Sequence, residues 1–434
     1  KAACSIVAAL VLSGCANAAV RAAEEGDRTR LRNEIASKHE RGALSNDEAA
    51  SIARAVASRE LEAAKDEASA LARLHETRAC TRDLDDAFEA RMKVHDGAGA
   101  EAALALFEDK KLSEAAARDY LDDADDRWRA VGTRTLHREE DAKRRRAAML
   151  DPSARVRRSA LRASGEAQDP GDFDVLFETA RVDPELLLRN EALRAMSAVA
   201  RGDEGRKRAA ELATRLRDLY TSGDDAIRED VAVAWALSPV FENGGRAALR
   251  TLIAGGAGSG ALAGAGVVLR TNANDAELSE SAHALLARTI ASGSRRDRLH
   301  AIAITKASGR ELDALRTAAK DDDLDIRVPA LSRLLESVPD RAGTVRKLEI
   351  VAGDKDARLR EHVERARLAL ASVGHLRIQA WIEEDLKASE AGRRTFAASA
   401  LAALGRSARA APLLADPDPS VRTRVACTIL VSAR

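Results

Sequence analysis

The sequence predicts an all-α fold in which helix pairs stack into an α-solenoid, or superhelix. Two observations carry this prediction. A short frame recurs along the chain, in which an aspartate is followed five residues later by an aliphatic residue and then at once by an arginine. Apolar residues follow each frame at helical spacing, as with Val156, Ala160 and Ala163. The frame arginines lie 28 to 39 residues apart between Arg129 and Arg228, and a period of this length is typical of stacked helix pairs.

Each frame is expected to begin a helix. The aspartate can cap free backbone N–H groups, and Pro152, Pro184 and Pro417 suit a first helical turn. The arginine comes about a turn and a half later, where it can meet the aspartate of a neighbouring repeat. The clearest frames are Asp151 with Arg157, Asp183 with Arg189, Asp321 with Arg327, Asp354 with Arg360, and Asp416 with Arg422. Weaker frames end at Arg129 and Arg228, and the long intervals leave room for degraded repeats near Leu262, Arg298 and Arg394.

This pattern resembles HEAT repeats, especially the short bacterial kind related to phycobilisome-lyase HEAT-like repeats. The resemblance covers residues 120–434. It implies that the aspartate lies in the turn between helices A and B, that the arginine lies on helix B, and that the two form a structural ladder along the stack. It also implies that B helices line the concave face. It implies no catalytic residue. Because every frame shows helical spacing and none shows sustained alternation, residues 120–434 are expected to be paired antiparallel helices without a sheet.

The N-terminus resembles a bacterial lipoprotein signal. Lys1 precedes an apolar run, Ala2 to Leu12, that is too short to span a bilayer. It ends in Leu12-Ser13-Gly14-Cys15, which resembles a lipobox, so residues 1–14 are expected to be removed and Cys15 to carry the lipid. Residues 15–30 would then form a tether. The alternative is an ordinary secretory signal cut near Ala18-Ala19. Ala16 after the cysteine favours the outer membrane, periplasmic face, by resemblance to Gram-negative lipoproteins.

Residues 31–119 are expected to be an N-terminal helical region without clean frames. Ser45 and Glu48 form a capping box at the start of an amphipathic helix. The region is expected to cap the solenoid by covering the first repeat, and an independent helical module is the alternative.

The four cysteines do not suggest a disulfide framework. Cys4 lies in the expected signal and Cys15 is the expected lipidation site. In an extended solenoid Cys80 and Cys427 would lie near opposite ends, so we expect them to be unpaired, small buried residues.

Two stretches resemble binding motifs. Residues 251–269 hold six glycines and no charged residue. They mimic a dinucleotide fingerprint and a membrane dimer motif, but the βαβ context and the apolarity are missing, so a degraded repeat whose helices approach closely or break is expected.

Residues 143–146, Lys-Arg-Arg-Arg, could contact an acidic partner, although a solvated helix face is the simpler interpretation.

Composition narrows the function. Lys plus Arg and Asp plus Glu are 70 each, and aromatic residues are 3% of the 434, which argues against a nucleic-acid partner. The eight histidines are scattered, no catalytic or metal-binding motif is present, and no cofactor, metal or small-molecule substrate is expected. The sequence therefore predicts a non-enzymatic, membrane-anchored scaffold for envelope proteins. The alternative is a lyase-type enzyme or chromophore-handling protein acting on a partner protein.

Overall fold

The computed structural model describes residues 18–41, 44–256 and 258–434, and across these ranges the chain forms helices, turns and no β-strand. The predicted all-α solenoid is therefore confirmed. The chain divides into two compact units. Unit 1 contains Lys1–Ser113 and Leu348–Arg434, and unit 2 contains Glu114–Lys347. No helix in the described ranges is long and apolar enough to cross a bilayer.

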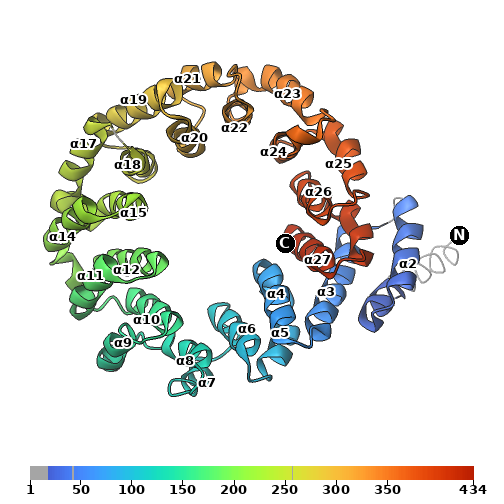
Figure 1. Cartoon of the computed structure of the whole chain (residues 1–434), viewed down its shortest axis with the longest axis horizontal. Coiled ribbons are helices and arrows are strands. Elements are labelled where there is room, and N and C mark those ends of the chain that lie inside the picture. Colours follow the sequence, from blue (N-terminus) through green and yellow to red (C-terminus); the bar gives the residue numbers. More distant parts are fainter. Residues whose placement is uncertain (1–17, 42–43, 257) are drawn as a thin grey trace, which may run out of the picture. The chain divides into compact units, whose positions relative to one another are not determined.

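Unit 2 is built from helix pairs arranged in two layers. Figure 1 shows the B helices along the inner side of the arc that this unit forms, and the A helices along its outer side. The A helices are α7 (Glu114–Arg118), α9 (Ala142–Ala148), α11 (Phe173–Val182), α14 (Ala209–Ser222), α17 (Arg246–Gly255), α19 (Ala276–Ser292) and α21 (Glu311–Ala318). The B helices are α8 (Asp126–Thr133), α10 (Ala154–Ala167), α12 (Leu186–Val199), α15 (Asp225–Trp235), α18 (Gly258–Thr271), α20 (Arg295–Ile304) and α22 (Leu324–Leu334). Successive B helices pack against each other from α8 to α22.

The core of unit 2 lies between these two layers. The aliphatic residues of the frames in unit 2 are all buried. They are Val156, Leu188, Ile227 and Ile326. Because the next buried residues follow at helical spacing, each B helix presents one apolar stripe to its A helix and to its neighbours.

Unit 1 joins the two ends of the chain. Its C-terminal part contains α24 (Arg360–Ser372), α25 (Gln379–Asp385), α26 (Ala391–Ala403), the 3₁₀ segment η7 (Ser407–Ala415) and α27 (Pro419–Ser432). Its N-terminal part contains α2 (Arg28–Glu40), α3 (Asn46–Ala63), α4 (Glu67–Thr77), η1 (Arg78–Asp83), α5 (Asp85–Met92) and α6 (Gly97–Glu108). Helix α23 (Val338–Ala352) contains the division between the units.

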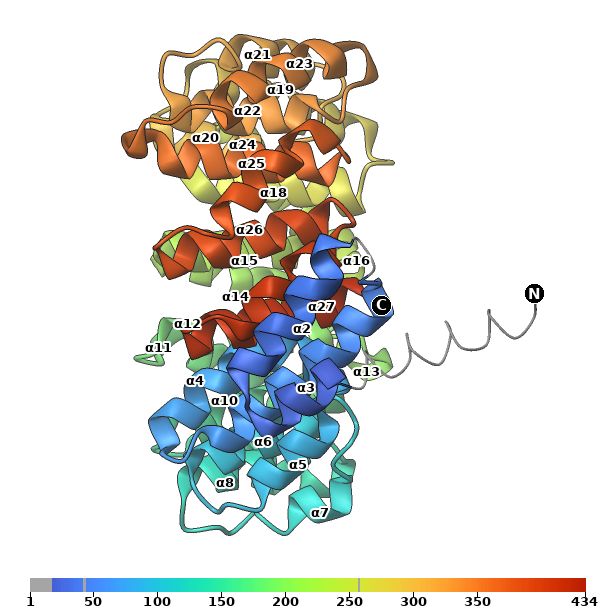
Figure 2. The same ribbon diagram turned by 90° about the vertical axis from the view of Figure 1, so that its right-hand side faces the viewer.

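The N-terminal helices stack on the last repeat. Helix α3 packs against α27, and α2 packs against η7, so the α2–α3 hairpin takes the place of a further A–B pair. Arg32 Nη2 donates to the main-chain oxygen of Ala415 across this contact at 3.3 Å. Figure 2 shows α2 and α3 beside α27. The capping box at the start of α3 is confirmed, since Glu48 N donates to Ser45 Oγ and Ser45 N donates to Glu48 Oε2.

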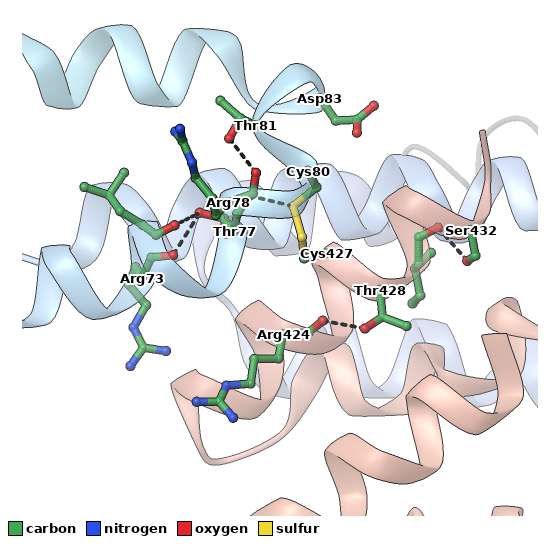
Figure 3. The surroundings of a disulfide bond; sticks show 12 residues. Arg73, Thr77, Arg78, Cys80, Thr81, Asp83, Arg424, Cys427, Thr428 and Ser432 are labelled. Carbon is green, nitrogen blue, oxygen red and sulfur yellow. Dashed lines mark hydrogen bonds between the residues drawn. A yellow bond between two sulfur atoms is a disulfide. The ribbon is translucent and has the colours of Figure 1, made fainter. Parts of the chain in front are cut away.

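The expectation that Cys80 and Cys427 are unpaired is wrong, because they form a disulfide with the two Cα atoms 5.5 Å apart. Figure 3 shows the bond between η1 and α27. The expectation assumed an extended solenoid with distant ends, whereas the N-terminal helices lie on the last repeat. Around the bond, Arg424 Nε lies 3.3 Å from Glu76 Oε1 and Arg434 Nη2 donates to Asp83 Oδ2 at 2.6 Å.

The glycine-rich stretch is a repeat in which a helix breaks and two helices approach closely, as the sequence predicted. Helix α17 ends at Gly255 and is capped by Gly256, whose φ of +66° suits glycine. Helix α18 then packs against α15 with little space between the backbones. A Cβ on Gly260 would lie 3.3 Å from Arg228 Cβ, and one on Gly264 would lie 3.6 Å from Ala232 Cβ, both on α15.

Residues 18–25, expected as part of a tether, are helical, and Ala19 and Ala22 are fully buried. Cys15, the expected lipidation site, lies outside the described residues.

Candidate protein-binding face and the aspartate–arginine ladder

The frame aspartates lie in the turns before the B helices and organise those turns. Asp151 accepts a hydrogen bond from Ser153 N at 2.8 Å, and Asp321 accepts one from Asp323 N at 2.9 Å. The same i to i+2 bond occurs at Asp183, Asp354 and Asp416. The helix N-cap is the residue two positions later, so the aspartate shapes the turn and does not cap the helix directly. This corrects the capping role that the sequence suggested.

The frame prolines do not lie in the first helical turn, where the sequence analysis expected them. Pro152, Pro184 and Pro417 each come one residue before the N-cap, outside the first helical turn. Their fixed φ angle therefore constrains the turn, not the helix.

The frame arginines bind their own turn and the next repeat at once. Arg157 Nη1 donates to the main-chain oxygens of Asp151 and Pro152, both at 3.0 Å, and its Nε donates to Asp183 Oδ2 at 2.8 Å. Both side chains of this ion pair are largely buried. Arg394 repeats the arrangement with Asp416, at 2.7 Å from Nε. One guanidinium thus fixes a turn and joins two repeats.

The other frame arginines follow this geometry with local differences. Arg189 Nη1 lies 3.4 Å from Asp224 Oδ2, two residues beyond the frame position Ser222. Arg360 Nη2 lies 3.2 Å from a glutamate, Glu390. Arg327 Nη1 donates to the main-chain oxygen of Asp321 at 3.0 Å.

The ladder also passes through two positions that the sequence left as degraded repeats or weak frames. Arg298 Nη2 donates to Asp321 Oδ2 at 2.6 Å, and Arg129 Nε lies 3.6 Å from Asp151 Oδ2. The pKa of Asp321 is lowered from its ordinary value, first by the hydrogen bond from Asp323 N and then by Arg298. An ionised Asp321 is therefore the form that the turn stabilises.

The basic cluster at 143–146 is a solvated face only in part: Lys143 and Arg144 are exposed, whereas Arg145 departs from the sequence interpretation. Arg145 is fully buried, and its Nε donates to Asp172 Oδ2 at 2.6 Å. Its other nitrogens bind Asp169 and the main-chain oxygens of Leu136 and Arg138. A guanidinium held in this way cannot contact an acidic partner, so Arg145 joins two repeats from inside.

A second row of charges crosses the exposed face of the B helices in unit 2. Arg162 on α10 donates from Nε to Glu191 Oε1 on α12 at 3.1 Å. Glu191 also lies 3.8 Å from Arg194, and Arg134 at the C-cap of α8 pairs with Glu166 on α10. We call these residues, with Asp230 and Val233 on α15, the B face.

The B face holds a small hollow and two buried polar atoms without a hydrogen-bond partner. The hollow has a volume of about 280 Å³ and lies among Arg134, Arg162, Glu166, Glu191 and Arg194. Burial raises the pKa of Asp230 above the ordinary aspartate value, although Arg194 opposes the shift. Asp230 Oδ2 and Asn190 Oδ1 are buried without a hydrogen-bond partner. Val233, one turn beyond Asp230, is 37% exposed.

Sequence reasoning overlooked this second row, although a signal was present. Arg134, Arg162 and Arg194 each lie five residues after a ladder arginine, so they repeat with the same spacing as the ladder. Five residues along a helix turn the side chain to a different face, which is why one set of arginines joins the turns and the other lies on the B face.

The described residues include no cluster of three or more His, Cys, Asp or Glu side chains that could hold a metal ion.

Comparisons with known proteins identify no family. No protein-family model matches the chain, and no curated protein matches it. Among solved structures, the chain is similar to UNC-45 from Drosophila melanogaster, with 13% identity, a TM-score of 0.33, and coverage of 97% of this chain and 75% of that one. At this identity and score the likeness says nothing about the site. The chain is a helical-repeat protein whose architecture suits protein–protein interaction.

Proposed function

We propose that this chain is a HEAT-type scaffold of the bacterial cell envelope that binds a partner protein through its B face. The observation that carries the proposal is the B face itself. Its arginines and carboxylates cross four successive B helices, and it leaves Asp230 Oδ2 and Asn190 Oδ1 without partners inside the protein. Buried polar atoms without partners cost free energy, and a bound protein that turns these side chains outward and donates to them would recover part of it.

The partner is expected to present hydrogen-bond donors and a small apolar group. Donors would meet Asp230 and Asn190, and the apolar group would meet the exposed Val233. Interfaces commonly combine a small apolar centre with a polar rim.

The HEAT-type assignment rests on the repeat geometry. Arg157 and Arg394 each bind the carbonyl of their own turn and the aspartate of the next repeat, which is the ladder that the resemblance implies.

The envelope location is supported by the cysteines. A disulfide between Cys80 and Cys427 suits an exported protein, because oxidising compartments preserve such bonds and the cytosol reduces them. We further propose that a lipid on Cys15 anchors the chain to the outer membrane, on its periplasmic face. Acyl chains contribute about 0.8 kcal/mol per buried CH₂, so two or three chains would hold it permanently.

Site-specific photo-crosslinking tests the partner face. A photoreactive phenylalanine at Arg158 or Arg194, both exposed on B helices, should capture the same protein in intact cells. The matched control positions are Glu178 and Arg181, which are exposed on the A helix α11. A further crosslinker position is Glu62 on α3. If the partner were captured only from the positions on α11, or only from Glu62, the B face would not be the binding surface.

The anchor has a separate test. The parent should incorporate a palmitate analogue and fractionate with the outer membrane, and Cys15→Ser should lose both properties. Unchanged labelling and fractionation of the variant would disprove the lipid anchor, and the crosslinking result would be unaffected.

A further inference from the structure

A pocket in the A layer of unit 2 has the features of a small-molecule site. Its volume is about 470 Å³, within the range of ligand pockets. Most of its lining residues belong to α14 and α17, two helices that lie in the layer opposite the B helices (Figure 1). Its walls include Arg217 and Tyr220 of α14, Trp235 of α15, and Ala248, Thr251 and Leu252 of α17.

The pocket gathers scarce aromatic residues. The whole chain has two tyrosines and three tryptophans, and Tyr220 and Trp235 meet here with ring centroids 5.3 Å apart. Trp235 is almost fully buried, and its Nε1 donates to the main-chain oxygen of Ala213 at 3.4 Å. Burial raises the pKa of the Tyr220 hydroxyl, so this group stays neutral at physiological pH. The pocket therefore has a fixed, uncharged and largely apolar wall.

An insertion in the repeat accompanies the pocket. The connection from α15 to α17 contains α16 (Ser238–Val240) and the π-helical turn η4 (Phe241–Gly245), and η4 packs against both α14 and α17. Gly244 has a φ of +122°, and a Cβ on Gly245 would lie 2.2 Å from the main-chain oxygen of Trp235. This close packing fixes the insertion between the two helices that form the pocket.

One arginine that lines the pocket, and a second one near it, lack the carboxylate partners that other arginines have. Arg246 and Arg250 on α17 pair with Asp275 and Glu277. Arg217, by contrast, is exposed at the edge of the pocket and has no carboxylate within 4 Å among the described residues. Arg288 has none either, and its Nη2 lies 3.7 Å from where a Cβ on Gly256 would be, next to the lining residue Gly255. Unpaired guanidinium groups beside an apolar wall favour an anion.

We propose that this pocket binds a small free amphiphile, a carboxylate with an apolar body. The body would lie against Tyr220, Trp235 and Leu252, and the carboxylate would pair with Arg217. The sequence predicted no small-molecule ligand, because single aromatic residues scattered through a chain do not reveal that two of them share a pocket.

Dye displacement tests the proposal on the full chain. The fluorescent aromatic sulfonate 8-anilinonaphthalene-1-sulfonate should bind at about one molecule per chain. Dodecanoate, kept below its micellar concentration, should displace it. Dodecanol, which has the same chain without the charge, should displace it at least about fivefold less well.

Variants localise the binding and separate the head group from the body. Arg217→Gln should weaken dodecanoate about fivefold or more and leave dodecanol unchanged. Thr251→Trp should fill the pocket and abolish displaceable dye binding. Arg158→Gln, an exposed arginine on α10, is the matched control and should behave like the parent.

Two outcomes would overturn the proposal. One is a Thr251→Trp variant with a parental circular dichroism spectrum that binds dye and dodecanoate as the parent does. The other is equal displacement by dodecanoate and dodecanol in both the parent and Arg217→Gln. If Thr251→Trp fails to fold, Ala248→Leu is the substitute variant. It fills less of the pocket and should also weaken displaceable dye binding.

Discussion

Arg422 of the last repeat pairs with Glu60 of the N-terminal helix α3, with Nε 2.7 Å from Oε1, although the two residues are 362 positions apart. Arg422 Nη1 also binds the main-chain oxygens of Asp416 and Pro417. This is the arrangement of Arg157 and Arg394, with Glu60 in place of the next repeat's aspartate. The ladder therefore continues from the C-terminal repeat into the N-terminal helices.

Arg422→Ala is expected to destabilise unit 1 by about 2–4 kcal/mol. The substitution leaves Glu60 and two turn carbonyls without their donor in a largely buried place, and removing one partner of such a pair is costly. Urea unfolding followed by Trp381 fluorescence measures this, in a Trp128→Phe, Trp235→Phe background. Trp381 then reports unit 1 alone, because the other two tryptophans lie in unit 2.

Arg360→Ala is the matched control, since Arg360 and Glu390 are both nearly half exposed. Exposed pairs contribute about 0–1 kcal/mol, so this variant should change the midpoint little. Equal effects of the two substitutions would show that the Arg422–Glu60 pair does not hold the ends together.

The sequence predicted the B helices well because each is marked by its own residues. The aspartate, the aliphatic residue and the arginine lie within one turn and a half of each other, so local chemistry decides where the helix begins. The A helices have no such frame. Their positions follow only from packing, and the insertion of α16 and η4 between Trp235 and Arg246 could not be foreseen from spacing.

The closure of unit 1 could not be predicted for a different reason. The apolar stripe of α3, with Ile52 and Val56, is equally suited to the first repeat or the last. The sequence around Glu60 and Cys80 contains no feature that predicts Arg422 and Cys427 as their partners. The burial of Arg145 was missed because charge runs usually face water, and the two aspartates that compensate it, Asp169 and Asp172, lie more than twenty residues later.

Asp230→Asn is expected to stabilise unit 2 at neutral pH. The folded protein raises the pKa of Asp230, chiefly by burial, so ionisation of this group is harder in the folded state than in the unfolded chain. Its contribution to stability therefore falls as pH rises from the unfolded value, about 3.9, through the folded value. The gain from the substitution should be present at pH 7 and disappear toward pH 3, as measured by urea unfolding monitored through Trp128 and Trp235.

Asp141→Asn is the opposite case and serves as the control. The ion pair with Arg118 lowers the pKa of Asp141, so its stabilisation is present above the unfolded pKa and is lost as pH falls through the folded one. This variant should be less stable than the parent at pH 7. A stabilising Asp141→Asn, or an Asp230→Asn without effect at pH 7, would contradict the charge arrangement described above.

Gly260→Val is expected to destabilise unit 2 by about 1–3 kcal/mol, because overpacking a close contact forces neighbours to move. The added side chain would press on Tyr220 and on Arg228 Cβ, which is 3.3 Å from the Cβ position. Gly343→Ala on α23 is the control, since nothing lies within 4 Å of its Cβ position. It should stabilise by up to about 1 kcal/mol through helix propensity. Thermal unfolding by circular dichroism measures both.

Reduction of the Cys80–Cys427 disulfide is expected to destabilise unit 1 and leave unit 2 largely unchanged. The bond closes a loop across 347 positions. In the chain-entropy model a loop of this length stabilises by roughly 6 kcal/mol, while removal of native disulfides typically costs about 2–5 kcal/mol. In a Cys4→Ala, Cys15→Ala chain, a reductant should lower the urea midpoint reported by Trp381 and leave that of Trp128 and Trp235 in place.

The control is the double substitution Cys80→Ala with Cys427→Ala, which should match the reduced parent and be insensitive to reductant. Equal midpoints for the oxidised and reduced parent would mean that the ion pairs at Glu60, Glu76 and Asp83 suffice to hold α3, α4 and η1 against α27.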